Sequence, residues 1–412
     1  MSVLEVRFLD VGQGDCTYIR FPNGTTMLID CKFSEDSFLT MLDELLPSDD
    51  DDNKVIDYLV ITHPHEDHIM GIGKLGERYL IKNIWESGHR LYIEEKDQAQ
   101  YTHYYNMLDL IQKVKRKNGN HHKLTAYNEL NIDDEPDVKI LVLSPTKAYL
   151  EDEKPSERDI HDQCVVLRME YNGRSILFTG DSSMEAWKER IVPYYSDESG
   201  RPNLLDSTIL HVSHHGSYTF YKPKGKSKDE AYTDAIEKID PEIAIISVGK
   251  DNRHGHPDED ALALYNKYTF NEQVFMTMDH ETIFVQIDED GNYTIETETM
   301  RNSAKLLTIG AVSIVTTPPP NEDGSYDIGV KLTFKAKITK MPSDQIIKNI
   351  TWIVQNNAVG EDKHHEWYEG QHDNSRTYEN QTAYSGSHTL LCEVRNKRGR
   401  MVATQAIRVN VK

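Results

Sequence analysis

A short stretch of the chain, from residue 62 to residue 68, gathers three histidines and two acids. It reads Thr-His-Pro-His-Glu-Asp-His, and the side chains that suit a metal are those of His63, His65, Asp67 and His68. Imidazole and carboxylate together bind Zn²⁺, Mn²⁺ or iron. His63 and His65 can chelate one ion while Asp67 and His68 reach a second. A stray pair of histidines is usually a solvated surface feature, but a cluster this dense favours a metal site.

The element that must position these histidines is the apolar run Tyr58–Ile61. Its β-branched, aromatic and aliphatic residues are bounded by polar segments, which is typical of a buried strand. Pro64 lacks an N–H and disfavours the helical region for His63, so the chain stays extended as it leaves the sheet. We therefore expect the histidines to lie where a strand ends and a loop begins.

The pattern His63-x-His65-x-Asp67-His68 resembles the signature of the metallo-β-lactamase fold. Other segments narrow the resemblance, and these are Phe8–Cys16, Phe178–Asp181 and Ser213–Ser217. In this order they resemble the hydrolase domain of ComEC-type DNA-uptake (competence) proteins and its free-standing relatives. The resemblance covers roughly residues 2–295. It implies an α/β fold, an αββα sandwich with the site at one edge, and is much less specific for the substrate.

The segment Asp10–Asp15 contains two glycines that permit a tight turn, so that Asp15, and Asp10 with it, can point into a site. A glycine-rich turn alone is more often just a turn. The resemblance makes this loop a border of the active site, because it has that place in ComEC-type domains. Asp30, at the end of the next apolar run, resembles the first motif of the fold, an acid that supports the histidine loop from behind.

His161 stands just before a strand expected from Cys164 onward. Metallo-β-lactamase domains in general place a metal-binding histidine there, whereas the ComEC-type pattern has asparagines and a serine. The chain departs from the narrower pattern at this point. We expect His161 to bind metal, with Asp162 as the other candidate.

Asp181 follows the apolar run Ile176–Thr179, and Gly180 allows a close approach of the backbone. A carboxylate at a strand end can bridge two ions with one oxygen on each. An isolated Gly-Asp pair is usually a turn, but the resemblance places the bridging aspartate of the fold here.

Two later segments supply the remaining histidines. Adjacent side chains at a strand end point in different directions, so only one of His214 and His215 is expected to bind metal. We assign the metal to His214, and contact with the substrate or proton shuttling to His215. Asn252–Pro257 resembles the last motif of ComEC-type domains, which implies that His256 protonates the leaving group or holds a phosphate oxygen.

The predicted centre thus holds two divalent ions, Zn²⁺ or Mn²⁺. The expected ligands are His63, His65 and His161 for the first ion, Asp67, His68 and His214 for the second, and Asp181 as the bridge, together with a hydroxide. The expected catalytic residues are Asp67, His215, His256 and Asp15.

The reaction that the resemblance implies is hydrolysis of a phosphodiester. DNA is the favoured substrate because ComEC-type domains are thought to degrade DNA. One alternative is a small-substrate metallohydrolase acting on a cyclic nucleotide, a lactam or a thioester, since this fold hosts all of these. The other is an effector or scaffold subunit that a C-terminal module recruits to a larger assembly.

The length of 412 residues favours two domains, which we place at residues 1–300 and 306–412. A hydrophobic fraction of 38% with 28% charged residues is that of a globular protein without a membrane-spanning run. Strand-like sequence begins at Ser2 and leaves no room for a signal peptide, so we expect a cytoplasmic protein. The four cysteines lie far apart, and we expect no disulfide.

The net charge of −22 argues at first against nucleic acid. Residues 301–412 carry 15 Lys and Arg against 11 Asp and Glu, so the acidity belongs to the first 300 residues. Bound ions can supply the positive charge that a phosphate needs. The net charge therefore weakens the case for a nucleic-acid substrate without excluding one.

The last hundred residues change character, with Pro318–Pro320 among strand-like runs. Trp352 and the segment Ser385–Val394 resemble the central strands of an immunoglobulin-like or PKD-like β-sandwich. Phe334 lies on the strand expected to face Cys392, so the inter-sheet disulfide of such domains is absent. We expect this all-β module to bind a protein partner or to position a substrate.

Overall fold

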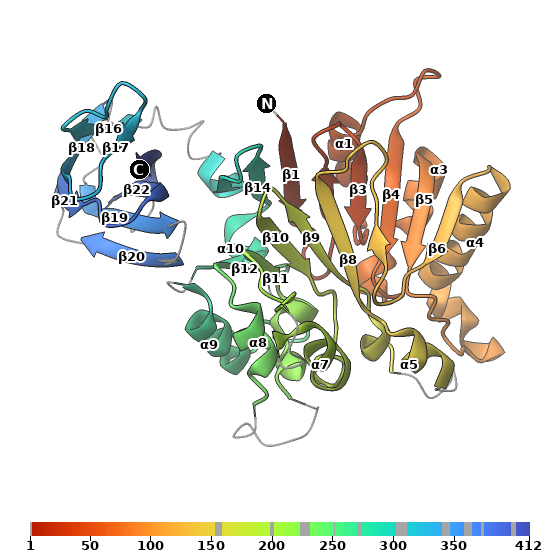
Figure 1. Cartoon of the computed structure of the whole chain (residues 1–412). Helices are drawn as coiled ribbons and strands as arrows, with labels where there is room; N and C mark the ends of the chain where they lie inside the picture. The colour runs from red at the N-terminus through yellow and green to blue at the C-terminus, as the bar shows by residue number, and fades with distance from the viewer. Residues whose placement is uncertain are drawn as a thin grey trace. The chain divides into compact units, whose positions relative to one another are not determined.

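The structure is a computed structural model with two compact units, Met1–Thr299 and Met300–Lys412 (Figure 1). The residues that it describes are 2–152, 159–197, 202–222, 231–250, 252–270, 273–301, 311–339, 347–357, 365–371, 375–396 and 401–412.

The described part of the first unit contains two β-sheets. The larger sheet has the order β15 (Tyr293–Thr297), β14 (Ile283–Asp288), β1 (Val3–Phe8), β2 (Thr17–Arg20), β3 (Thr26–Ile29), β4 (Val55–Ile61), β5 (Leu80–Glu86) and β6 (Asn120–Lys123). The other has the order β13 (Val274–Met276), β12 (Ile243–Ile246), β11 (Ile209–His211), β10 (Arg174–Phe178), β9 (Val166–Tyr171), β8 (Val138–Ser144) and β7 (Glu129–Leu130).

Helices follow the strands along the chain. The first part of the unit contains α1 (Asp36–Leu45), α2 (Glu66–Ile69), α3 (Ile72–Arg78), the 3-10 helix η1 (Glu95–Tyr101) and α4 (Thr102–Arg116). The second part contains α5 (Lys147–Asp152), η2 (His161–Gln163), α6 (Met184–Ala186), the π-helix η3 (Trp187–Ile191), α7 (Val192–Tyr195), η5 (Ser213–Gly216), η6 (Tyr218–Phe220), α8 (Asp234–Ile239), α9 (Glu259–Tyr268) and α10 (Thr277–His280).

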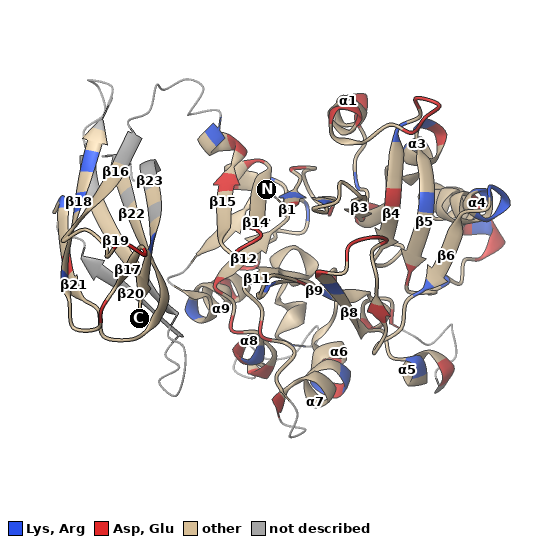
Figure 2. Ribbon diagram, turned by 45° about the horizontal axis from the view of Figure 1, so that its top comes forward, with Lys and Arg blue, Asp and Glu red and all other residues tan. Residues whose placement is uncertain are grey.

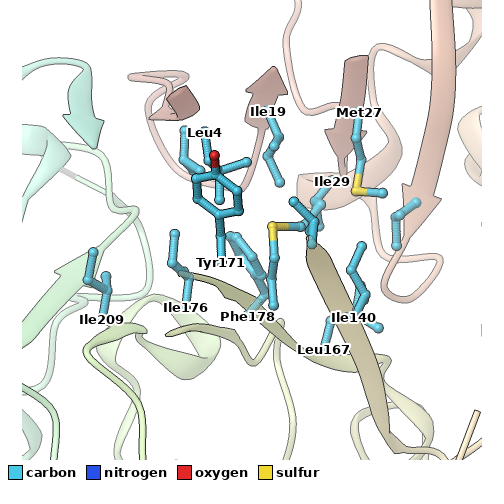
Figure 3. Close-up of a cluster of buried hydrophobic side chains, with 14 of the residues drawn as sticks. Leu4, Ile19, Met27, Ile29, Ile140, Leu167, Tyr171, Ile176, Phe178 and Ile209 are labelled. Atoms are coloured by element: carbon cyan, nitrogen blue, oxygen red, sulfur yellow. The ribbon is translucent and has the colours of Figure 1, made fainter. Parts of the chain in front are cut away.

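Three hydrophobic cores show that the layers are stacked as helix, sheet, sheet and helix. Between the sheets, alternate residues of the strands meet, such as Ile19 and Ile29 from one sheet and Ile176 and Phe178 from the other (Figure 3). The outer face of the larger sheet packs against α1 to α4, and the outer face of the other packs against helices between residues 184 and 268. The αββα fold predicted from the sequence is confirmed.

The site loops leave the sheets at the ends of parallel strands. In the larger sheet β3, β4 and β5 are parallel, and in the other sheet β10, β11, β12 and β13 are parallel. The carboxyl ends of parallel strands lie at one edge of a sheet, where open α/β sheets place their sites. The loops after β4, β10 and β11 carry the histidine cluster, Asp181 and the pair His214 and His215.

From residue 311 onward, the regular elements of the described part of the second unit are strands. One sheet has the order β16 (Ala311–Thr317), β18 (Lys331–Thr339) and β21 (Thr377–Gln381). The other has the order β17 (Ser325–Tyr326), β23 (Met401–Val411), β22 (Gly386–Asn396), β19 (Ile347–Asn357) and β20 (His365–Gln371).

The two sheets of this unit share one hydrophobic core. In it the buried Trp352 stacks on Tyr378 with ring centroids 5.9 Å apart, and Trp352 pairs in register with Cys392, a buried free thiol. An all-β second unit was expected from the sequence, and its immunoglobulin-like class stays a prediction.

Charged residues of both signs are mixed along the outward helices of the first unit, as Figure 2 shows for α4, α5 and α8. Within the described ranges, no helix has both the length and the apolar character needed to cross a membrane.

Candidate metal centre

The histidine loop begins where β4 ends, and Asp30 holds it from behind. The backbone N–H of Thr62 donates to Oδ1 of Asp30 at 2.8 Å, and the Thr62 hydroxyl donates to Oδ2 at 2.6 Å. Nδ1 of His68 lies 2.7 Å from the same Oδ2. Both His68 and Asp30 are buried. These contacts fix the ring of His68 so that its other nitrogen, Nε2, faces the site.

A first group of possible ligand atoms comes from His63, His65, His161 and Asp181, all within 4.8 Å of one another. Nδ1 of His65 lies 3.0 Å from Nε2 of His63 and 3.3 Å from Nε2 of His161. Oδ2 of Asp181 is 3.6 Å from Nε2 of His63 and 3.9 Å from Nε2 of His161. The structure therefore brings together the three histidines that the sequence assigned to the first ion.

A second group comes from Asp15, His68, Asp181 and His215, again within 4.8 Å. Nε2 of His68 lies 3.1 Å from Oδ1 of Asp181, and Nε2 of His215 lies 3.9 Å from the same oxygen. Nε2 of His215 is also 3.4 Å from Oδ2 of Asp67. The two groups share Asp181, which turns Oδ2 to the first and Oδ1 to the second.

The second group has the polar atoms that a cation would satisfy. Oδ1 of Asp15, Nε2 of His68, Oδ1 of Asp181 and Nε2 of His215 are buried, and none makes a well-aligned hydrogen bond among the described residues, although Nε2 of His68 and Oδ1 of Asp181 lie 3.1 Å apart. Buried polar atoms normally make hydrogen bonds, so four that converge without a well-aligned one indicate a missing positive charge. Nitrogen and carboxylate oxygen are ligands that Zn²⁺ and Mn²⁺ accept. The residues therefore fit a divalent ion in this group.

The pKa shifts differ between the two groups. Burial, with the neighbouring histidines, lowers the pKa of His63 well below its ordinary value and that of His65 to about 4, so both rings are neutral at pH 7. Burial alone would raise the pKa of Asp15, but His211 and His215 outweigh it and lower that pKa to about 2. Neutral imidazole and ionised carboxylate are the forms that bind metal.

In the second group, burial alone would lower the pKa of His68 and of His215. Asp181 and the neighbouring carboxylates outweigh burial, raising the pKa of His68 well above its ordinary value and that of His215 to about 9. A divalent ion in the second group would take the place of these protons.

The backbone around Asp181 is closely packed. Gly180 has φ of 48°, and a Cβ at this position would lie 2.5 Å from Sγ of Cys164. The backbone N–H of Asp181 donates to the same sulfur at 3.2 Å. Only glycine fits this turn without displacing Cys164, and the turn aims the Asp181 carboxylate between the two ligand groups.

His214 and His215 are both in the left-handed region, with φ of 51° and 55°. Their rings consequently face different groups. His214 lies beside His161, with ring centroids 4.6 Å apart, and its Nε2 is 3.6 Å from Oδ2 of Asp181. Nδ1 of His215 donates to the Ser247 carbonyl at 2.9 Å, which turns Nε2 into the second group. From the sequence we assigned the second ion to His214 and the substrate to His215, whereas the structure puts His215 and not His214 among the four residues of the second group. Which of the two contacts the substrate stays a prediction.

The remaining predicted residues have distinct places. Asp67 is not in either group of four, but its Oδ2 faces Nε2 of His215. Asp162, the alternative to His161, pairs with Arg190 at 2.8 Å and accepts a short hydrogen bond from Ser183. The ring of His256 lies 5.7 Å from that of His214.

His211, the last residue of β11, is a neighbour of the site that the sequence did not single out. Its Nε2 lies 2.8 Å from the Ser247 hydroxyl and 3.5 Å from Oδ1 of Asp15. The available signal was three histidines within five residues at the end of a strand.

The chain belongs to the metallo-beta-lactamase superfamily of metal-dependent hydrolases, whose family model matches residues 9–249. A second family model, the adenylyl/guanylyl and SMODS C-terminal sensor domain, matches residues 321–412. The ComE operon protein 3 of Bacillus subtilis (strain 168) is 27% identical over 281 residues, which cover 64% of this chain. The match spans only 31% of that relative's length. The resemblance predicted for the first unit is confirmed.

Two solved structures are distant likenesses of parts of this chain. Zn²⁺-bound PqqB from Methylobacterium extorquens is 9% identical, with a TM-score of 0.42 over 68% of this chain and 99% of that one. The PKD1 domain of the Vibrio cholerae metalloprotease PrtV is 12% identical, with a TM-score of 0.17 over 25% of this chain and 98% of that one. Both are too remote to carry an argument about function.

Proposed function

We propose that the first unit is a two-metal phosphodiesterase that hydrolyses DNA. The observation that carries the proposal is the pair of ligand groups that share Asp181, one built on His63, His65 and His161 and the other on His68 and His215. Two bound divalent ions, Zn²⁺ or Mn²⁺, would lower the pKa of a water molecule and neutralise the charge that develops on a phosphoryl group.

The side from which a substrate approaches follows from the exposure of the ligands. The side chains of His68, His215 and Asp181 are at most 1% exposed. By contrast, those of His161 and His214 are 22% and 20% exposed, and that of Asp67 is 32% exposed. A phosphate therefore reaches the centre past His161, His214 and Asp67.

His256 lies on this accessible side and suits a role in holding the phosphate. Its side chain is 13% exposed, and its buried Nδ1 has no hydrogen-bond partner among the described residues. Burial lowers the pKa of His256, with Asp258 acting in the opposite direction. At pH 7 the ring is neutral and can donate one hydrogen bond to a phosphate oxygen or to the leaving group.

DNA as the substrate rests on the likeness to the hydrolase domain of ComEC-type proteins. The chain has a net charge of −22, so the bound ions must supply most of the attraction for a phosphate. A fold of this kind also hosts hydrolases of small substrates, and a digestion experiment separates the two candidates.

For the second unit we propose a regulatory role, supported by the match of residues 321–412 to a family described as a sensor domain. It would control the hydrolase or recruit a protein partner. An effector of this kind would act in the cytoplasm, without a membrane partner.

The proposal is tested by digestion of linear, circular and single-stranded DNA with Mn²⁺ or Zn²⁺ added. The comparison is between the wild-type chain and the double variant Asp67→Ala/His68→Ala, with His103→Ala as a matched control. His103 is a partly exposed histidine on α4 outside both ligand groups. We expect metal-dependent cleavage that the double variant loses and His103→Ala keeps, and cleavage of circular DNA would establish endonuclease action.

Absence of cleavage by protein shown to contain two ions would contradict DNA hydrolysis. Turnover of a cyclic nucleotide, a lactam or a thioester by the same protein would then establish the small-substrate alternative. Cleavage that survives in the double variant would exclude this centre as its source.

A further inference from the structure

The second unit contains a cavity of about 240 Å³ between its two sheets. Strands of both sheets line it, as do the residues that follow β21. The lining residues are Leu332, Phe334, Val354, Tyr378, Asn380, Gln381, Thr382, Ala383, Tyr384, His388, Thr389, Leu390, Val409 and Val411. Ala383 is exposed, so the rim reaches the surface, whereas Leu390 at 2% exposure lies deep in the core.

The residues that line the cavity disfavour a charged ligand. Lys, Arg, Asp and Glu are all missing from the lining residues. An ion that entered would lose its hydration without gaining a counter-charge, which costs several kcal/mol. The walls offer aliphatic side chains and the rings of Phe334, Tyr378 and Tyr384, beside the uncharged polar groups of Asn380, Gln381, Thr382 and Thr389 and the imidazole of His388. Such a surface favours flat, uncharged molecules, because aromatic rings stack on one another.

The rim is held by hydrogen bonds. The Thr382 hydroxyl donates to the Asp327 carbonyl at 2.8 Å, and the Val330 N–H donates to the same hydroxyl at 2.9 Å. Nε2 of His388 donates to the Tyr384 carbonyl at 2.9 Å. A rim fixed in this way loses little conformational entropy when a ligand binds.

We propose that this cavity binds a small, uncharged, aromatic molecule of one or two rings. An apolar cavity of about 150 Å³ is large enough to bind benzene, so the cavity of the second unit has room for one ring or a fused pair. A phosphate-bearing nucleotide is disfavoured because neither Lys nor Arg is among the described residues that line the cavity. The inference goes beyond the proposed hydrolase and does not depend on it.

The test is calorimetric titration of the full chain with indole as the uncharged probe and indole-3-carboxylate as its charged counterpart. Two variants reduce the space in different ways. Ala383→Trp closes the exposed rim with little effect on the core, and Val354→Phe fills the interior. Val315→Trp is the control, because Val315 is 52% exposed on β16 and does not line the cavity.

We expect indole to bind the wild type and Val315→Trp alike, and to bind the two cavity variants at least about tenfold more weakly. Indole-3-carboxylate should bind the wild type about tenfold more weakly than indole does. The cavity proposal is overturned if the wild type does not bind indole, or if it binds indole and indole-3-carboxylate equally well. It is also overturned if Ala383→Trp binds indole as tightly as the wild type does. Thermal unfolding verifies that each variant is folded. If Val354→Phe does not fold, the indole affinity of Ala383→Trp alone tests the proposal. Metal content and hydrolysis should be unchanged in all three variants, so failure here leaves the proposed hydrolase standing.

Discussion

Nδ1 of His68 lies 2.7 Å from Asp30, while Nε2 of the same ring lies 3.1 Å from Asp181. The ring thus joins a carboxylate behind the histidine loop to the carboxylate shared by both ligand groups. With Nδ1–H donating to Asp30, the ring presents Nε2 as the metal-binding atom. Asp30 determines which nitrogen faces the site without itself entering a ligand group.

Replacing Asp30 by Asn should weaken metal binding in the second group about 10–100-fold, because the amide no longer fixes the tautomer and orientation of His68. Calorimetric titration with Zn²⁺ measures the affinity. Asp57→Asn is the control, since Asp57 also accepts a hydrogen bond from a backbone N–H, that of Thr26, but lies outside both groups. Equal Zn²⁺ affinities in the two variants would refute the role assigned to Asp30.

Removing one histidine of the pair after β11 should separate their roles. His215→Ala should reduce the metal content from two ions per chain to about one, because His215 contributes to the second group. His214→Ala should keep both ions and lose activity. Inductively coupled plasma mass spectrometry gives the metal content. The opposite result, with the ion lost from His214→Ala alone, would restore the assignment made from the sequence.

The sequence was sufficient for most of the fold of the first unit, and for naming residues that the structure brings together, because its signals there are local. The apolar run before His63 and the Gly-Asp pair at Asp181 predict strand ends, and both lie at strand ends in the structure. The roles of His214 and His215 could not be separated, because both residues adopt a left-handed conformation that L side chains rarely adopt. The cavity of the second unit could not be predicted either, because strands distant in sequence line it.

Gly180→Ala should lower the free energy of unfolding of the first unit by more than the strain of a positive φ alone would. The added Cβ would lie 2.5 Å from Cys164 and 3.1 Å from Thr62, so it would clash with the first side chain and crowd the second. This clash comes on top of a backbone strain of about 1 kcal/mol or more. Gly173→Ala is the matched control, because Gly173 also has a positive φ of 76° but has no heavy atom within 4 Å of the added Cβ. Urea unfolding should show a larger loss for Gly180→Ala. Equal losses would mean that the packing around Gly180 contributes nothing.

Glu86, at the end of β5, should make stability depend on pH. Burial alone would raise its pKa, but hydrogen bonds from Arg90 and His121 outweigh burial and lower the pKa to about 2 from 4.5. Because the folded pKa lies below the unfolded one, the ionised carboxylate stabilises the protein above about pH 4.5. That stabilisation, on the order of 3 kcal/mol, is lost as the pH falls toward 2.

The free energy of unfolding of the wild type should therefore exceed that of Glu86→Gln at pH 6, and the difference should shrink by pH 3. Urea unfolding at several pH values measures both proteins under the same conditions. A difference that stays constant across this range would show that Glu86 is not stabilised in its ionised form.

The central claim is that two ions share Asp181, and anomalous diffraction from crystals of the full chain grown with Zn²⁺ tests it most directly. The account predicts two peaks in the first unit, one among His63, His65 and His161 and the other among Asp15, His68 and His215, on either side of the Asp181 carboxylate. A single peak, or peaks that do not flank Asp181, would contradict it.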